Sequence, residues 1–259
     1  MCTVLLRFRP GESWPLLMAA VRDEFVEREW DPPAAHWNGP AAGLLGGRDR
    51  TAGGTWMAVD PDPARPAVAA LLNGVRRPLP DGPPRPTRGT LVLDALGRGQ
   101  LPEPAMIKDH DGFPLLLATP TQVEVWSWNG EDLAHQTLAA GDHIVVNLGI
   151  DAAQDPLIPH FAPLLESLPD PELSIDLPPG EAWEPWTDLL RGDGLAGDDP
   201  RALVVRRELE GRHYGTTSAS LVALSPGALR YDFNADPRNP SAWYEVASLG
   251  DAPARSATA

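Results

Sequence analysis

Short apolar runs separated by turn residues recur along most of the chain. The first two, Val4 to Phe8 and Leu16 to Val21, flank Pro10-Gly11-Glu12-Ser13 and predict an amino-terminal β-hairpin. The same pattern predicts further strands, which bring the expected total to about ten: Thr55 to Val59, Ala67 to Leu72, Leu115 to Thr119, Val123 to Trp128, Leu133 to Leu138, His143 to Leu148, Ala202 to Leu209, Thr216 to Leu224 and Leu229 to Phe233.

Helical spacing occurs in three places. Gly89 to Leu96 predicts a short helix that ends near Gly97. Two later groups of apolar residues recur at helical intervals and predict two helices that cover one face of a sheet: Phe161, Leu164, Leu165 and Leu168, then Trp183, Trp186, Leu189 and Leu190. Strands followed by helices and then by strands indicate an α+β fold and argue against a doubly wound parallel sheet.

The domain organisation is predicted from the length of the chain and from the position of its proline-rich segment. A chain of 259 residues can bury one full core, and we expect a single domain over residues 1–250. Arg76 to Arg88 contains five prolines without periodicity and predicts a surface loop or lid. Asp251 to Ala259 is expected to be a frayed tail.

Charge and composition narrow the expected partners. The formal net charge of -15 would repel nucleic acid and anionic lipid, and no apolar run is long enough to cross a bilayer. The single cysteine, Cys2, excludes an intramolecular disulfide and a cysteine-rich zinc site, which fits the reducing cytoplasm. The six histidines show no close helical pairing, which argues against a metal site. We expect no cofactor to be required. The sequence leaves the oligomeric state undefined.

Cys2 is the first candidate for chemistry. Removal of Met1, which is usual before a small side chain, would give Cys2 both a thiol and a free α-amine, whose ordinary pKa is about 7.7 to 8.0. One residue would then provide a nucleophile and a base for its proton. The alternative is that Cys2 opens a strand as a small apolar residue.

Charged and amide side chains at strand ends form a second group of candidates. Arg22 and Asp23 follow the second strand of the predicted hairpin, so antiparallel pairing places them near Cys2. Arg22 would favour thiolate, and Asp23 would orient the α-ammonium. Asn73 and Asn147 each close an apolar run and are suited to donate to an oxyanion. The alternatives are a solvated charge cluster for the first pair and turn residues for the second.

Ordered motifs along most of the chain resemble the NRDE family, which includes transport and Golgi organization protein 2. The Asn-Arg-Asp-Glu motif that names the family corresponds to Val21-Arg22-Asp23-Glu24. The other matching segments are Met1-Cys2, Gly47-Arg48-Asp49, Ala52-Gly53-Gly54-Thr55-Trp56, Leu72-Asn73, Thr87-Arg88-Gly89, Asp111-Gly112-Phe113, His143-Ile144-Val145-Val146-Asn147 and Tyr214-Gly215-Thr216-Thr217-Ser218.

The resemblance implies a four-layer αββα sandwich of two mainly antiparallel sheets, similar to the N-terminal nucleophile hydrolases. Its enzyme kin include cysteine amidases that cleave linear amides. By this resemblance Cys2 would be the nucleophile, with Arg22 and Asp23 beside it and Asn73 and Asn147 as oxyanion donors. Trp56, Tyr214 and Thr217 would line the substrate side of the site.

The sequence departs from the family pattern at three positions. Val21 stands where the motif has Asn, Thr217 stands where an Arg usually follows Tyr-Gly-Thr, and Pro114 stands where an Asn usually follows Gly-Phe. Loss of a charged donor at position 217 would alter specificity or weaken catalysis.

Two functions therefore remain open, besides a third possibility that the chain is a catalytically silent relative retained for interactions. The first is hydrolysis of a small-molecule linear amide by Cys2. The second, which the resemblance implies, is binding and trafficking of haem or of a hydrophobic ligand, such as a lipid or an acyl-coenzyme A, in an aromatic-rich cleft with little or no catalysis. Fold alone does not choose between these two functions.

Overall fold

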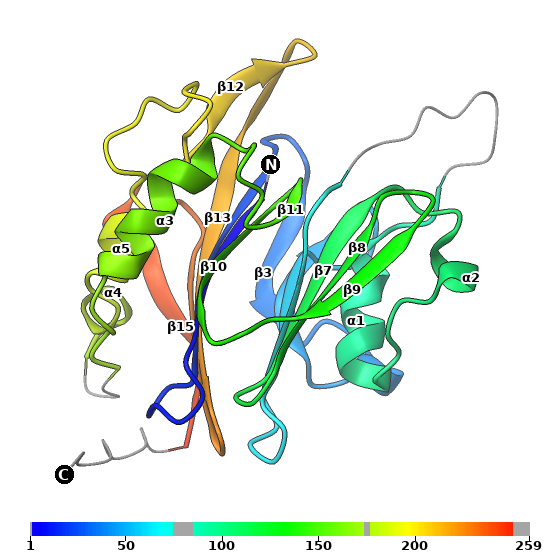
Figure 1. Cartoon of the computed structure of the whole chain (residues 1–259), viewed down its shortest axis with the longest axis horizontal. Coiled ribbons are helices and arrows are strands. Elements are labelled where there is room, and N and C mark those ends of the chain that lie inside the picture. Colours follow the sequence, from blue (N-terminus) through cyan, green and yellow to red (C-terminus); the bar gives the residue numbers. More distant parts are fainter. Residues whose placement is uncertain (1, 75–84, 174–176, 251–259) are drawn as a thin grey trace.

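The computed structural model describes residues 2–74, 85–173 and 177–250. Two antiparallel sheets lie face to face, with helices on both outer faces (Figure 1). Sheet A has the order β11-β10-β1-β2-β13-β14-β15, with β12 paired to β13, and sheet B runs from β3 to β9 in sequence order. The expected αββα sandwich of the α+β class is confirmed.

The strand and helix bounds are as follows. Sheet A contains β1 (Thr3–Phe8), β2 (Leu16–Phe25), β10 (Gly141–Val146), β11 (Gly149–Ile150), β12 (Arg206–Leu209), β13 (Arg212–Ser225), β14 (Ala228–Asn234) and β15 (Trp243–Leu249). Sheet B contains β3 (Trp30–Ala34), β4 (Leu45–Asp49), β5 (Met57–Asp60), β6 (Ala67–Leu71), β7 (Phe113–Ala118), β8 (Val123–Trp128) and β9 (Leu133–Thr137). The α-helices are α1 (Gly89–Arg98), α2 (Pro104–Ile107), α3 (Leu157–Ser167), α4 (Pro179–Ala182) and α5 (Trp186–Leu189).

Three apolar layers hold the sandwich together. The central layer lies between the sheets and joins residues from both chain ends, such as Val4 and Phe233, to Val59 and Leu116 of sheet B. A second layer packs α3, α4 and α5 on the outer face of sheet A, as expected for the later helices. The third packs α1 against sheet B. Because strands such as β1 are covered on both faces, they read as continuous apolar runs.

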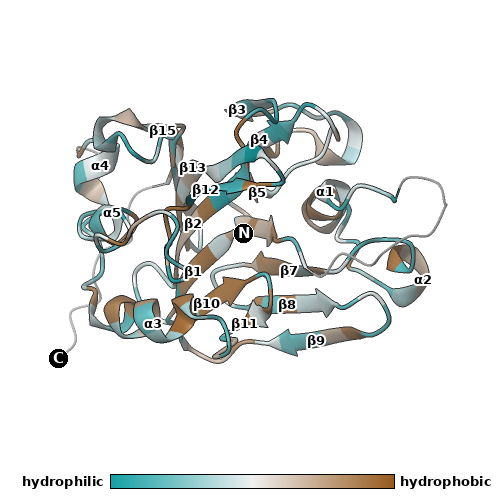
Figure 2. Cartoon of the chain, turned by 90° about the horizontal axis from the view of Figure 1, so that it is seen from above, coloured by the Kyte–Doolittle hydropathy of each residue, from teal (hydrophilic) through white to brown (hydrophobic). Residues whose placement is uncertain are grey.

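The amino-terminal hairpin forms as predicted and is central to sheet A. Thr3 pairs with Val21, and Phe8 pairs with Leu16. β1 also pairs with β10, and β2 also pairs with β13 over most of its length. Figure 2, viewed from above, shows the start of the chain between the two sheets.

Arg7 lies on the helix-facing side of β1 although it is almost fully buried. Its guanidinium makes two hydrogen bonds to Asp142 and one to Asp170. It also donates to the carbonyls of Leu165, at 2.6 Å, and Leu168, at 2.7 Å, near the end of α3. Arg7 therefore ties β1 and β10 to the end of this helix through two of the carbonyls there.

Several elements differ from the sequence expectation. β3, β4, β11 and β15 were not predicted. Two prolines in β3 and two glycines in β4 hide the strand pattern, and β11 is only two residues long. β2 and β13 are longer than expected, since their polar ends pair with each other near the site. The helix predicted from Trp183 to Leu190 is shorter in the structure: α5 covers only Trp186–Leu189, and α4 lies before it. Of the strand predicted from Ala202 to Leu209, only the second half forms, as β12. The predicted loop lies largely, and the predicted tail wholly, outside the described residues.

Candidate functional site

Cys2 is half-buried immediately before β1. Its Sγ donates to the backbone carbonyl of Asp23 at 3.9 Å, so the sulfur lies beside the end of β2. Cys2 also lines a void of about 10 Å³ together with Arg22, Trp56 and Ser218. The hairpin register therefore brings Cys2, Arg22 and Asp23 together, as the sequence predicted.

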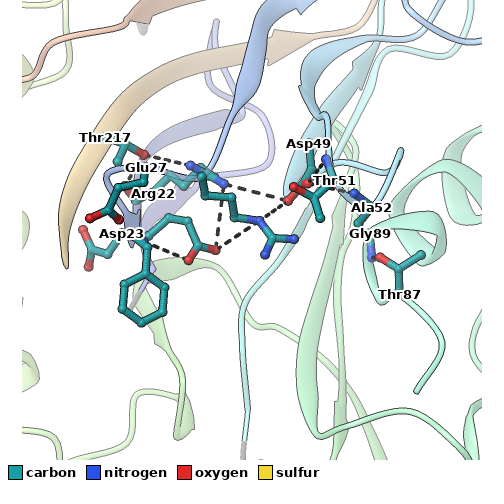
Figure 3. Close-up of polar contacts among 12 residues, drawn as sticks. Arg22, Asp23, Glu27, Asp49, Thr51, Ala52, Thr87, Gly89 and Thr217 are labelled. Atoms are coloured by element: carbon teal, nitrogen blue, oxygen red, sulfur yellow. Dashed lines mark hydrogen bonds and ion pairs between the residues drawn. The ribbon is translucent and has the colours of Figure 1, made fainter. Parts of the chain in front are cut away.

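Arg22 connects the two sheets next to Cys2. Its Nη1 donates to Thr217 Oγ1 at 2.9 Å, and its Nη2 lies 4.0 Å from Asp49 Oδ2 of sheet B (Figure 3). Asp49 also pairs with Arg28 at 2.6 Å, and its other oxygen accepts the backbone N–H groups of Thr51 and Ala52. The Arg22 side chain is only 4% exposed, so these contacts satisfy a buried charge and fix its position.

Trp56 supports the other side of the Arg22 guanidinium. The guanidinium carbon lies 4.4 Å from the ring centroid, which is within cation–π range. A Cβ built on Gly47 would lie 2.3 Å from the Trp56 ring, so glycine at this position lets the indole lie against the backbone. Trp56 therefore positions Arg22 and helps to wall the void beside Cys2.

Asp23 and Tyr214 form the side of the site nearest β13. Thr216 Oγ1 donates to Asp23 Oδ1 at 2.6 Å, and the Tyr214 hydroxyl donates to the Asp23 carbonyl at 3.0 Å. That carbonyl is also the acceptor of Cys2 Sγ. A bulge between Thr216 and Ser218 displaces Thr217 from the regular register, and Thr217 exchanges hydrogen bonds with Arg22.

An open cavity of about 820 Å³ adjoins this group, and Tyr214 is part of its wall. Asn73, which follows β6, and Asn147, which follows β10, also line it. Val4 pairs with Val145, and this register, continued by two residues, places Asn147 opposite Cys2. The remaining lining residues are Glu24, Phe25, Glu27, Arg28, Glu29, Thr51, Gly74, Arg88, Asp111, Arg207, Leu209 and Arg212.

Burial dominates the electrostatics of the site. It raises the pKa of the Cys2 thiol, and the positive charge of Arg22 acts in the opposite direction. Burial also raises the pKa of the Asp23 carboxyl, which the Thr216 hydrogen bond partly offsets, and it raises the pKa of Tyr214. The thiol is therefore protonated at neutral pH and needs a base before it can act as a nucleophile.

The structure thus joins Cys2, Arg22, Asp23, Trp56, Tyr214 and Thr217 through direct contacts, and it places Asn73 and Asn147 along the adjoining cavity. Thr217 faces Arg22 as its hydrogen-bond partner. Val21, by contrast, is buried in the apolar layer on the helix side of sheet A. The replacement of the family's Asn by Val21 therefore affects the packing of this apolar layer.

Sequence reasoning missed Asp49, Arg28, Thr216 and Arg207. Asp49 stands in the quoted segment Gly47-Arg48-Asp49, but its contact with Arg22 crosses from one sheet to the other. Among the described residues, no three His, Cys, Asp or Glu side chains converge into a metal site. No described helix has the length and apolar character needed to cross a bilayer.

Comparison with models of protein families identifies a relationship for the first part of the chain. The model of the family described as Transport and Golgi organisation 2 matches residues 1–152, which include Cys2, Arg22, Asp23, Trp56, Asn73 and Asn147. The matched segment ends before β12 and β13, which contribute Arg207, Tyr214 and Thr217. No curated protein matches the chain.

Proposed function

The chain belongs to the Transport and Golgi organisation 2 family, and on this premise we propose that it is an amino-terminal cysteine hydrolase of linear amides. The observation that carries the proposal is the placement of Cys2 Sγ beside Arg22 and Asp23, behind the wall of a cavity lined by two asparagines. This grouping provides a nucleophile, a cation and amide donors in one place.

The reaction begins after removal of Met1. The α-amine of Cys2 takes the thiol proton, and the thiolate attacks the amide carbon. The carbon–nitrogen bond then breaks as the α-ammonium returns the proton to the leaving amine, which gives a thioester at Cys2. Water, deprotonated by the same amine, attacks the thioester and releases a carboxylic acid and the free thiol.

Arg22 and Asp23 have separate tasks in this scheme. The guanidinium of Arg22, held by Trp56 and Thr217, stabilises the thiolate by its charge. The carboxylate of Asp23, held by Thr216, orients the α-ammonium of the processed chain. Both side chains are almost fully buried, which strengthens their effect on neighbouring charges.

Asn73 and Asn147 are the proposed oxyanion donors. Neither side chain makes a hydrogen bond to another described residue, and Asn147 Oδ1 is buried without a described partner. Their amide groups are therefore not used to hold the scaffold. Loss of one such donor would be expected to lower kcat by about 10²- to 10³-fold.

The first test combines intact mass with hydrolysis. We expect the purified protein to lack Met1 and to release glycine from N-octanoylglycine or glycinamide from N-octanoylglycinamide, with a thioester adduct at Cys2. Cys2→Ala should remove both product and adduct. The matched control, Ser225→Ala, lies at the far end of β13 and should leave turnover unchanged. Retained Met1, or equal turnover by Cys2→Ala, would refute the mechanism.

A ligand carrier is the second candidate, and one observation favours it. Leu209, a large exposed apolar side chain, lines the cavity, and two others, Val26 and Leu148, directly follow the lining residues Phe25 and Asn147 in the sequence. Exposed apolar side chains suit a hydrophobic ligand, such as haem or an acyl chain. A Soret shift on addition of haem, together with no turnover of either amide, would support a carrier; a haem shift that needs Cys2 would indicate thiolate ligation.

A further inference from the structure

A row of side chains crosses three neighbouring strands at the wall of the large cavity. Phe25 of β2 pairs with Tyr214 of β13, and Tyr214 pairs with Arg207 of β12. Directly paired residues on antiparallel strands project to the same face of a sheet. All three residues line the cavity, so Arg207 faces the same space as Tyr214.

Arg207 differs from the other arginines of this cavity. Arg28 pairs with Asp49, Arg88 donates to the Gly112 carbonyl, and Arg212 lies over the Phe25 ring and within 3.5 Å of Glu27. Arg207 has no hydrogen bond or ion pair with any residue in the described part of the chain, and its Nε is buried. Its guanidinium is therefore available to an anion from outside the protein.

An unpaired guanidinium beside apolar surface is costly for the fold. A buried donor without an acceptor loses its water and gains no hydrogen bond in return. A bound carboxylate would offset this desolvation penalty with short, charge-assisted hydrogen bonds. The chain carries a formal net charge of -15, so an anionic ligand needs a local cation to enter the cavity.

Arg207 is also close enough to influence the proposed reaction centre. Its charge lowers the pKa of both Asp23 and Tyr214, opposing their burial. Tyr214 donates to the Asp23 carbonyl, which also accepts the Cys2 thiol. An anion held by Arg207 would therefore lie near Cys2, and the rest of its ligand would contact Phe25, Tyr214 and Leu209.

We infer that Arg207 is a specificity-determining residue that binds a carboxylate of the substrate, so that the substrate class is a linear amide with an apolar acyl group and a carboxylate. This inference rests on the proposed function. It also bears on position 217, where Thr217 replaces the usual Arg of the family pattern. In this chain β12, which pairs with β13, supplies a guanidinium to the large cavity, whose lining does not include Thr217.

Binding to an inactive protein separates this inference from the reaction itself. In the Cys2→Ala background, calorimetry would compare N-octanoylglycine with N-octanoylglycinamide, which differ by one charge. We expect the carboxylate to bind about tenfold more tightly, which is the size of a charge-assisted hydrogen bond. Arg207→Gln should abolish this preference, and Arg207→Lys should retain part of it.

Arg206→Gln is the matched control, because Arg206 is an exposed neighbour on the same strand and does not line the cavity. It should keep the tenfold preference. Equal binding of the two compounds, a preference that survives Arg207→Gln, or equal losses in the Gln and Lys variants would each overturn the inference. Failure of hydrolysis with intact carboxylate preference would instead refute only the proposed reaction.

Discussion

At the scale of single residues, the Cys2 thiol is subject to two opposed influences. Burial raises its pKa, and the positive charge of Arg22 lowers it. Arg22 keeps its place through Thr217, Trp56 and the more distant carboxylate of Asp49. The guanidinium that favours the thiolate is therefore itself held by contacts with both sheets.

Arg22→Gln should shift the pH profile of thiol alkylation. Loss of the guanidinium removes a charge that favours thiolate, so the midpoint for iodoacetamide modification should move to higher pH. The rate at pH 7 should fall accordingly. Arg28→Gln is the control, because Arg28 belongs to the same ion-pair group through Asp49 but is not among the main influences on Cys2. An unchanged Arg22→Gln profile would contradict the role assigned to Arg22.

At the scale of elements, the hairpin of β10 and β11 carries Asn147 at its turn. Val146 pairs with Gly149, and Asp151 fastens the base of the hairpin. Asp151 Oδ1 accepts the Ile144 N–H at 2.8 Å, and its Oδ2 lies 2.8 Å from His143 Nδ1. His143 Nε2 lies 3.0 Å from the Ala139 carbonyl. His143 and Asp151 together therefore hold the element that presents Asn147 to the cavity.

His143→Gln should reduce stability in a pH-dependent way. The hydrogen bond to Asp151 raises the pKa of His143, with Asp142 adding to the effect, so the folded protein favours the charged imidazole. This stabilisation is complete below the unfolded pKa of about 6.5 and disappears as pH rises through the higher folded pKa.

Urea unfolding at pH 5.5 and pH 8.5 would measure this difference. The gap in free energy of unfolding between wild type and His143→Gln should be larger at the lower pH, by less than about 1 kcal/mol because the pair is partly solvated. Asp151→Asn keeps an acceptor for the Ile144 N–H and removes the charge, so it should show the same pH dependence of the gap. A gap that grows with pH would show that the assigned sign is wrong.

At the scale of the whole molecule, the two ends of the chain share one sheet. β2 from the amino-terminal part pairs with β13 from Tyr214 to Leu224, and the central core takes residues from β1, β14 and sheet B. The family match ends at residue 152, before β13. The segment that the family model matches is therefore only part of the sandwich that buries β2.

A chain of residues 1–152 should fail to fold as a stable unit. Without β13 to β15, the long edge of β2 and much of the central core would be exposed to water. We expect rapid proteolysis and no cooperative thermal transition by circular dichroism, whereas residues 1–250 should match the full chain. A cooperative transition of the shorter chain would show that the two halves are separate folding units.

The local sequence pattern determined the first hairpin and the position of several candidate residues at strand ends. The turn at Pro10 to Ser13 set the register of the first hairpin, and that register alone placed Arg22 and Asp23 beside Cys2. The asparagines at 73 and 147 were recognised because each closes an apolar strand. These features were predictable because alternation, turn residues and short loops act over a few neighbouring residues.

Tertiary structure decided the rest. Asp49 reaches Arg22 only because sheet B faces sheet A, and Arg207 reaches the cavity only because β12 continues the row from Phe25 and Tyr214. The proline-containing β3 and the glycine-rich β4 have low strand propensity. They form strands because neighbouring strands pair with their backbone N–H and C=O groups. Such contacts join segments far apart in the chain, and their free energy comes from burial between the layers, which no local pattern records.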